Sequence, residues 1–497
     1  MKHKLRQTGT CITLLLASLL VPIGNIYAQT ARPNIVIFIA DDVSYNDLGC
    51  MGHPVLKTPA IDKLAKNGIR FSNAYLTTSS CSPSRVSILT GRYPHNTGAA
   101  ELHSPIPPGQ VAFPKLLKES GYYTAQAGKW HLGSSGIKPD GPFLDAFDRV
   151  GGSHADGGGP GGEQAWVEYL QQRPKDKPFF MWFAAQDAHR GWDNAPKPVQ
   201  YSAQDVQVPD NLANTAATRT DLVRYYEEVS RFDHYVGKVV DELKAQGILE
   251  NTLIIVMADN GRPFPRNKTR MYDEGIKTPL IIHWPAGVKG RNQVSSSLVS
   301  AIDIAPTILE VAGISECASV QGKSFKTLLA EPTAKFRNYV FAEHNFHSFR
   351  AYERMVRTDK YVYIENGLPE QSNVGATDIM GGAAGAELKK HYLAGKATPL
   401  QALIFITPQP QFEFYDHSAD KDQLINLYGH KGYKAQQQHL ADILETWKKE
   451  TGDDQPEDLT PDWYDRWDNK ALPEKGKRGT MPGSLQNATS IQKPGPF

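Results

Sequence analysis

The chain has 497 residues, a formal net charge of +1 and 22% charged residues. A nearly neutral chain lacks the basic excess that binds nucleic acid or an anionic membrane surface, so we expect neither as a partner. The length is sufficient for one large α/β core and a smaller second domain.

Residues 1–28 have the pattern of a secretory signal peptide. Lys2, Lys4 and Arg6 precede an apolar run at 11–21, and the small residue Ala28 is the expected last residue before cleavage. The apolar run is too short for a membrane-spanning helix, although a membrane anchor is the alternative interpretation. We therefore expect a periplasmic or secreted protein without a membrane span.

Removal of this segment would leave three cysteines, namely Cys50, Cys81 and Cys317. An odd number excludes a complete disulfide framework and leaves at least one cysteine that needs its own explanation. Cys50 and Cys317 could pair, but nothing in the sequence indicates that they do.

The first two thirds of the chain alternate between buried strands and helices. Three continuous apolar runs, at 35–40, 178–184 and 252–258, are typical of strands buried on both faces. An apolar stripe with charges opposite predicts a helix over 220–247, where Gly247 is a stop signal. This pattern predicts a large, mostly parallel sheet between two layers of helices, in a catalytic domain at 29–335.

The pattern changes after residue 335. Short mixed strands at 339–342, 355–364 and 412–415 precede an amphipathic helix at 433–450. These elements predict a smaller C-terminal subdomain, 336–497, made of an antiparallel sheet with a helix on it. In the first domain, the glycine-rich stretch 151–162 reads as a loop.

Two pairs of polar residues directly follow predicted strands. Asp41 and Asp42 follow the first strand, and Asp259 and Asn260 follow the third. The carboxyl ends of parallel strands meet at one edge of a sheet, so these oxygen donors should lie together. Such ligands suit Ca²⁺ or Mg²⁺, whereas the alternative is ordinary turn chemistry.

The string at 81–92 places a cysteine at the start of a predicted helix. Ser82 can cap the helix and Pro83 fits its first turn, so Cys81 should lie where backbone N–H groups favour an anion. Arg85 adds a positive charge one turn later. Alone, Cys81 could be a reactive thiol or a small buried residue.

Cys-Ser-Pro-Ser-Arg at 81–85, followed by Leu-Thr-Gly-Arg at 89–92, resembles the signature of the type I formylglycine-dependent sulfatases. This family belongs to the alkaline-phosphatase-like superfamily. The resemblance implies that a maturase oxidises Cys81 to an aldehyde residue, 3-oxoalanine, whose hydrate is the nucleophile.

Other positions match the same family along the mature chain. Gly-Lys-Trp-His-Leu-Gly at 128–133 resembles a family segment and, if extended, directs Lys129 and His131 to the same side. Lys268, eleven residues before Pro279, matches the sulfate-binding lysine, and His189 matches the second active-site histidine. The resemblance also implies one Ca²⁺ whose ligands are Asp41, Asp42, Cys81, Asp259 and Asn260.

The chain departs from the family pattern at two places. Ala188 stands where the family often has proline, and 273–277 differs from the usual Glu-Gly-Gly-x-Arg. Within the family, the chain is most similar to sulfamidase-like members and to bacterial enzymes that desulfate polysaccharides. We therefore expect an exo-acting enzyme that removes sulfate from the end of a sulfated sugar chain, either an algal polysaccharide such as ulvan or carrageenan or a glycosaminoglycan.

The resemblance also implies a mechanism. Ca²⁺, Arg85, Lys129 and Lys268 neutralise the sulfate while a hydroxyl of residue 81 attacks sulfur. His189 protonates the leaving group, and His131 later removes the remaining hydroxyl proton as sulfate departs. The alternatives are a phosphatase or phosphodiesterase of the same superfamily and a non-catalytic sulfated-glycan-binding protein.

Substrate recognition should come from outside this set. The segment 344–350 carries His347 and Arg350, which suit a carboxylate or sulfate on a neighbouring sugar, with Arg354 and Arg357 beyond it. The glycine-rich loop is a second candidate. The alternative for 344–350 is a surface loop with solvated charges.

Overall fold

The computed structural model describes residues 1, 32–133, 139–151, 161–314 and 319–497. The expected signal peptide, Cys317 and most of the glycine-rich stretch lie outside these residues. Arg32–Phe497 forms one compact unit. No helix in the described part of the chain is long and apolar enough to cross a membrane.

The main sheet has eight strands in the order β5-β4-β6-β1-β7-β8-β2-β9. The strand β8 is antiparallel to both of its neighbours, and the other adjacent pairs are parallel. The bounds are β1 Asn34–Ala40, β2 Ile69–Phe71, β4 Tyr123–Gly128, β5 Arg149–Gly151, β6 Phe179–Ala184, β7 Thr252–Ala258, β8 Leu280–His283 and β9 Gln293–Ser295.

The three strands predicted from apolar runs are confirmed as the centre of this sheet. They are β1, β6 and β7, with Ile37 paired in register with Trp182 on one side and with Ile255 on the other. Alternate residues of β1 enter different cores, since Ile37 belongs to one apolar cluster and Phe38 to the other. Burial on both faces explains why these runs are continuously apolar.

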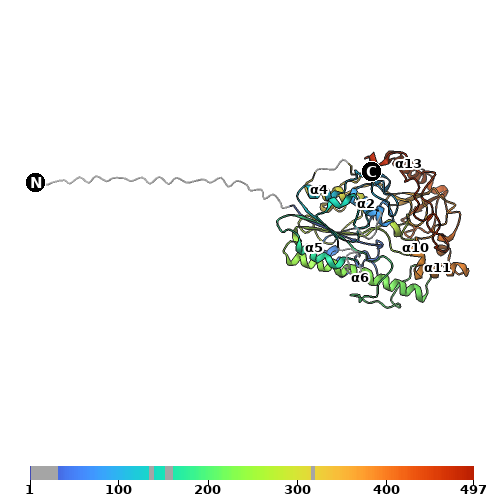
Figure 1. The fold of residues 1–497 in the computed structure, drawn as a ribbon, viewed down its shortest axis with the longest axis horizontal. Coiled ribbons are helices and arrows are strands. Elements are labelled where there is room, and N and C mark those ends of the chain that lie inside the picture. Colours follow the sequence, from blue (N-terminus) through green and yellow to red (C-terminus); the bar gives the residue numbers. More distant parts are fainter. Residues whose placement is uncertain (2–31, 134–138, 152–160, 315–318) are drawn as a thin grey trace. The chain divides into compact units, whose positions relative to one another are not determined.

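Helices cover both faces of the sheet, as predicted (Figure 1). One layer contains α1 (Pro59–Lys66), α5 (Trp166–Gln172) and α6 (Ala216–Ala245). The other contains α2 (Cys81–Thr90), α4 (Phe113–Glu119) and α8 (Ile304–Val311). The helix α6 starts four residues before the predicted bound of 220, because Thr215 accepts a hydrogen bond from Thr218 N and caps it.

A second, antiparallel sheet of four strands follows, in the order β11-β12-β13-β14. Its strands are β11 Val340–His344, β12 Glu353–Arg357, β13 Tyr361–Asn366 and β14 Phe412–Asp416. The helix α13 (Lys434–Thr451) packs on it through Trp447, whose ring stacks on Phe341 at a centroid distance of 5.1 Å. The predicted antiparallel sheet with a helix is thus confirmed.

The prediction of one strand at 355–364 is wrong. The chain turns between β12 and β13, where the Thr358 hydroxyl accepts hydrogen bonds from Lys360 N at 3.2 Å and Tyr361 N at 2.8 Å. These bonds satisfy backbone groups that a continuous strand would have used in its ladder.

Shorter elements connect the two sheets. A pair of strands, β3 (Ala74–Tyr75) and β10 (Val299–Ser300), lies outside both sheets. Two helices between β13 and β14 matter for the site, namely α10 (Thr377–Gly381) and α11 (Ala383–Leu393). Ala384 of α11 joins the core under α6, which fixes α10 near the end of the main sheet. The other α-helices are α3 Pro94–Thr97, α7 Asp273–Ile276, α9 Lys326–Ala330 and α12 Pro399–Ala402.

Candidate active site

Four polar side chains meet at the carboxyl ends of β1 and β7. Because these strands are neighbours, with Ala40 opposite Ala258, the residues that follow them are brought together. Asp42 N lies 3.3 Å from Asp259 Oδ1, and Asn260 Nδ2 donates to Asp42 Oδ1 at 2.6 Å. All four, Asp41 included, are at most 1% exposed. The predicted juxtaposition is confirmed.

Cys81 is the first residue of α2 and faces this acidic group. Its Sγ lies 3.6 Å from Asp41 Oδ1 and 3.9 Å from Asp42 Oδ1. Ser82 does not cap the helix as predicted, because the N-cap is Ser80. The Ser82 hydroxyl instead accepts a hydrogen bond from the backbone N–H of His103 at 2.9 Å.

Three buried cations each pair with one of the three carboxylates. Arg85 donates to Asp259 Oδ2 at 2.8 Å, and Lys268 Nζ lies 2.9 Å from Asp42 Oδ2. Lys129 forms an ion pair with Asp41. Burial lowers the pKa of Lys268, but the carboxylates of Asp378 and Asp42 outweigh it and hold this pKa well above its ordinary value.

Lys129 and His131 reach the site by a different backbone route from the one predicted. The strand β4 ends at Gly128, and His131 has a left-handed φ of 43°, so 129–133 is not extended. Gly128 has φ 97°, and a Cβ there would lie 1.9 Å from the carbonyl oxygen of Ala184. A glycine is needed at this close approach, and the chain then turns so that both side chains enter one cavity.

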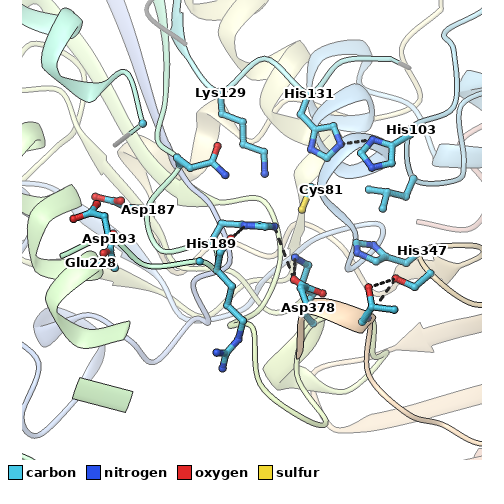
Figure 2. A pocket seen from close by; sticks show the side chains of 18 of the residues that line it. Cys81, His103, Lys129, His131, Asp187, His189, Asp193, Glu228, His347 and Asp378 are labelled. Atoms are coloured by element: carbon cyan, nitrogen blue, oxygen red, sulfur yellow. Dashed lines mark hydrogen bonds and ion pairs between the residues drawn. The ribbon is translucent and has the colours of Figure 1, made fainter. Parts of the chain in front are cut away.

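Cys81, Lys129, His131 and Lys268 line a cavity of about 910 Å³. Figure 2 shows Cys81 among Lys129, His131, His189 and His347. One wall comes from the main sheet and the other from the C-terminal part of the chain, which contributes Ser348, Thr377, Asp378, Trp463 and Tyr464. The cavity can therefore hold a group larger than sulfate alone.

The four histidines that line the cavity, His103, His131, His189 and His347, each have a nearby polar partner. His189 Nε2 lies 3.9 Å from Asp378 Oδ2, and His131 Nε2 lies 3.0 Å from His103 Nδ1. His347 Nδ1 lies 2.8 Å from the hydroxyl of Ser80, next to Cys81. Burial, reinforced by Lys268, lowers the pKa of His347 well below its ordinary value, so this ring is neutral.

Asp378 and His103 also line the cavity, although no sequence pattern predicts them as site residues. Asp378 accepts from Lys268 Nζ at 3.0 Å, and the positive charge of Lys268 helps to hold its pKa well below the usual range against the effect of burial. Neither residue follows a predicted strand or belongs to a motif. The folded contacts of α10 and of the loop before Ser104 bring them in, which no local pattern signals.

Arg350 is not where its predicted role requires it. It does not line the large cavity but borders a smaller one beside it, and its backbone N–H donates to Asp462. Arg354 is fully buried against Asp453, and Arg357 against Asp273. The surface-loop alternative is also wrong, since 344–349 is buried. Of the predicted recognition pair, only His347 faces the cavity.

The acidic group fits a divalent cation. The nearest ligand atoms of Asp41, Asp42 and Cys81 lie within 4.8 Å of one another. Asn260 Oδ1 is buried and has no hydrogen-bond partner among the described residues, which leaves one oxygen free to bind a metal ion. Carboxylate and amide oxygens are the ligands that Ca²⁺ and Mg²⁺ prefer.

A parallel α/β sheet that ends in acidic residues, with a helix-terminal cysteine among lysines and histidines, defines a hydrolase of anionic esters. The family model named Sulfatase matches residues 33–158 and 163–314. The model of the N-sulphoglucosamine sulphohydrolase C-terminal region matches 266–368. The chain belongs to the sulfatase family, the hydrolases of sulfuric esters, and the resemblance seen in its motifs is confirmed.

Individual relatives agree with this assignment. Human N-sulphoglucosamine sulphohydrolase is 34% identical over 309 residues, which are 56% of this chain and 61% of the human protein. An ulvan-active sulfatase of Formosa agariphila is 28% identical over 459 residues, covering 85% of this chain and 76% of that protein. The fold is shared with a solved structure of a protein in complex with its substrate D-glucosamine-2-N,6-O-disulfate, which has a TM-score of 0.63 at 23% identity and covers 84% of this chain and 98% of that one.

Proposed function

We propose that the protein removes sulfate groups from a sulfated polysaccharide or its oligosaccharides, acting on a sugar at the end of the chain. The observation that carries this proposal is the position of Cys81, buried at the start of α2 between three carboxylates and three cations at the base of a cavity. The names of the human and Formosa relatives support a sulfated carbohydrate as substrate.

Cys81 is the nucleophile precursor in this proposal. Burial raises the pKa of its thiol well above the ordinary value, although Lys129 and Lys268 oppose this, so the unmodified side chain is no thiolate. Oxidation by a formylglycine-generating maturase would supply a hydrated aldehyde whose hydroxyl group attacks sulfur.

Asp41, Asp42, Asp259 and Asn260 would hold one Ca²⁺ together with residue 81. When bound, the ion would supply positive charge for the sulfate and for the charge that develops in the transition state. Ca²⁺ accepts about six to eight oxygens, so a substrate oxygen fits the remaining coordination. The identity of the ion as calcium is part of the proposal.

The other residues bind the sulfate group or transfer protons. Lys129 and Lys268, which both line the cavity with Cys81, hold sulfate oxygens, while Arg85 fixes Asp259. His189 protonates the leaving group, and its Nε2 lies 3.9 Å from the carboxylate of Asp378. His131 removes a hydroxyl proton from residue 81 when sulfate leaves.

The proposal includes export and two regions of the chain. Residues 1–28 would be removed as a signal peptide, so that the protein acts in the periplasm or outside the cell. Residues 29–335 would form the catalytic domain, and 336–497 would contribute substrate recognition through His347 and its neighbours. Asp378 and His347, from the second region, both line the cavity.

An assay with paired substrates tests the proposal against its alternatives. Matured protein should hydrolyse an aryl sulfate, lose this activity on chelation and regain it with Ca²⁺. A preference for the matching aryl phosphate with two bound transition metals would favour the phosphatase alternative, and binding of sulfated glycans without turnover would favour the binding protein. A screen of O- and N-sulfated oligosaccharides, read by loss of sulfate mass, would then define the substrate.

A further inference from the structure

A pair of histidines connects the base of the cavity to its rim. His131 Nε2 lies 3.0 Å from His103 Nδ1, and the two ring centroids are 4.7 Å apart. His131 is 6% exposed and His103 is half-buried. Both rings line the cavity that holds Cys81, as Figure 2 shows. The pair therefore leads from a buried nitrogen toward solvent.

Both rings are neutral near pH 7. Burial lowers the pKa of His103 to about 4, with Arg478 and Lys129 adding to the effect. Burial and Lys129 lower the pKa of His131 well below its ordinary value. A hydrogen bond between two neutral imidazoles contains one proton, so one ring donates and the other accepts.

The contacts of His131 select one of the two possible arrangements. Its Nδ1 is buried and has no hydrogen-bond partner among the described residues. If His131 is to accept a proton from residue 81, Nδ1 is the nitrogen that remains available, and it must carry a lone pair. Nε2 of His131 then bears the hydrogen and donates it to Nδ1 of His103.

The position of His103 is held by hydrogen bonds of its own backbone and of the two residues before it. Its backbone lies in the left-handed region at φ 60°, which is unfavourable for a residue other than glycine. Its N–H donates to the hydroxyl of Ser82, adjacent to Cys81. On the other side, Leu102 N donates to Phe346 O at 3.0 Å, and Arg478 donates to Glu101 at 2.9 Å.

We propose that His103 is a positioning residue for His131. His103 fixes the tautomer of His131 and carries the proton of His131 away. This inference rests on the proposed sulfatase function. As sulfate leaves, the hydroxyl of residue 81 gives its proton to His131 Nδ1, the C–O bond to sulfate breaks with its electron pair on sulfate, and the carbonyl re-forms. The Nε2 proton of His131 passes to His103 Nδ1, and His103 releases its Nε2 proton to water.

The kinetic test separates the two halves of the reaction. His103→Leu removes the acceptor, and His103→Asn keeps an oxygen where Nδ1 lies. With an aryl sulfate, His103→Leu should release about one equivalent of the aryl alcohol in a fast burst, at the same rate as the parent. Its steady-state turnover should then be roughly 10–100-fold slower than that of the parent, which is the usual loss when the orienting partner of a histidine is removed. His103→Asn should recover part of the rate, and His234→Leu, at an exposed position on α6, should match the parent.

A spectroscopic test needs neither turnover nor the modified residue. In the unmodified Cys81 protein labelled with ¹⁵N-histidine, NMR should find His131 protonated at Nε2, and His103→Leu should change this tautomer ratio. A parent in which His131 is protonated at Nδ1 would overturn the proposal, as would a His103→Leu protein that slows burst and steady state equally. An inactive matured parent would instead refute the sulfatase function, and the NMR result would still decide the tautomer.

Discussion

At the scale of single residues, the site is a balanced set of charges around one thiol. Asp41, Asp42 and Asp259 each face a different cation, and Lys268 also faces Asp378, so the buried charges offset one another. Removing any member would leave an uncompensated buried charge, which costs about 3–5 kcal/mol. Substitutions of these residues should therefore be read with a stability measurement beside the rate.

His347 and Arg350 provide a matched pair that tests which residues reach the substrate. His347→Ala should lower kcat/KM on a sulfated oligosaccharide by about 0.5–1.5 kcal/mol, roughly twofold to twelvefold, because a neutral hydrogen bond beside Cys81 is lost. Arg350→Ala should leave kcat/KM unchanged, since its side chain does not line the cavity. Steady-state kinetics on one oligosaccharide checks both, and an equal loss in the two variants would contradict this placement.

At the scale of elements, the sequence predicted the features that local residue patterns determine and missed those that depend on contacts between distant segments. The apolar runs of β1, β6 and β7 are local consequences of burial on both faces, and their ends placed Asp41 and Asp259 correctly. The split between β12 and β13 and the position of Ser80 as the N-cap residue of α2 were missed. Ser82 has the right chemistry for a cap, but its hydroxyl is used by His103, a contact that only the folded chain creates.

The start of α6 gives a stability prediction. Thr215→Ala removes the hydroxyl that accepts from Thr218 N, and it should lower the free energy of unfolding by about 1 kcal/mol. Thr220→Ala is the control, since its hydroxyl bonds only to a carbonyl within the exposed first turns of the same helix. Urea unfolding followed by circular dichroism measures both. A Thr220→Ala loss as large as that of Thr215→Ala would argue against the cap.

At the scale of the whole molecule, the site joins segments that are far apart in the chain. Asp42 and Lys268 are separated by 226 residues, and Lys268 and Asp378 by 110. The motif residues could be assigned because each follows a strand or matches a family string. Asp378 and His103 could not, because their positions depend on how α10 and α11 pack against α6 and how Arg478 holds the loop at Glu101.

Metal binding should stabilise the entire fold, since four of the proposed ligands directly follow the central strands β1 and β7 and the fifth, Cys81, is the first residue of α2. Adding Ca²⁺ at about 100 times its Kd should stabilise the folded state by about 2.7 kcal/mol and raise the Tm. Asp42→Asn should abolish the shift and start from a lower Tm, but it should still fold, because Lys268 keeps Asp378 as a partner and asparagine tolerates the left-handed φ of 58° at this position. Differential scanning calorimetry with and without chelator checks this, and a full calcium shift in Asp42→Asn would exclude the proposed ligand set.

The central claim is that residue 81, in its oxidised form, is the sulfatase nucleophile. Preparations made with increasing amounts of maturase can be compared by the peptide mass at residue 81 and by the rate of sulfate release from an aryl sulfate. The rate should rise in proportion to the aldehyde fraction and should be absent from Cys81→Ala. Full activity in protein whose Cys81 remains a thiol would contradict it.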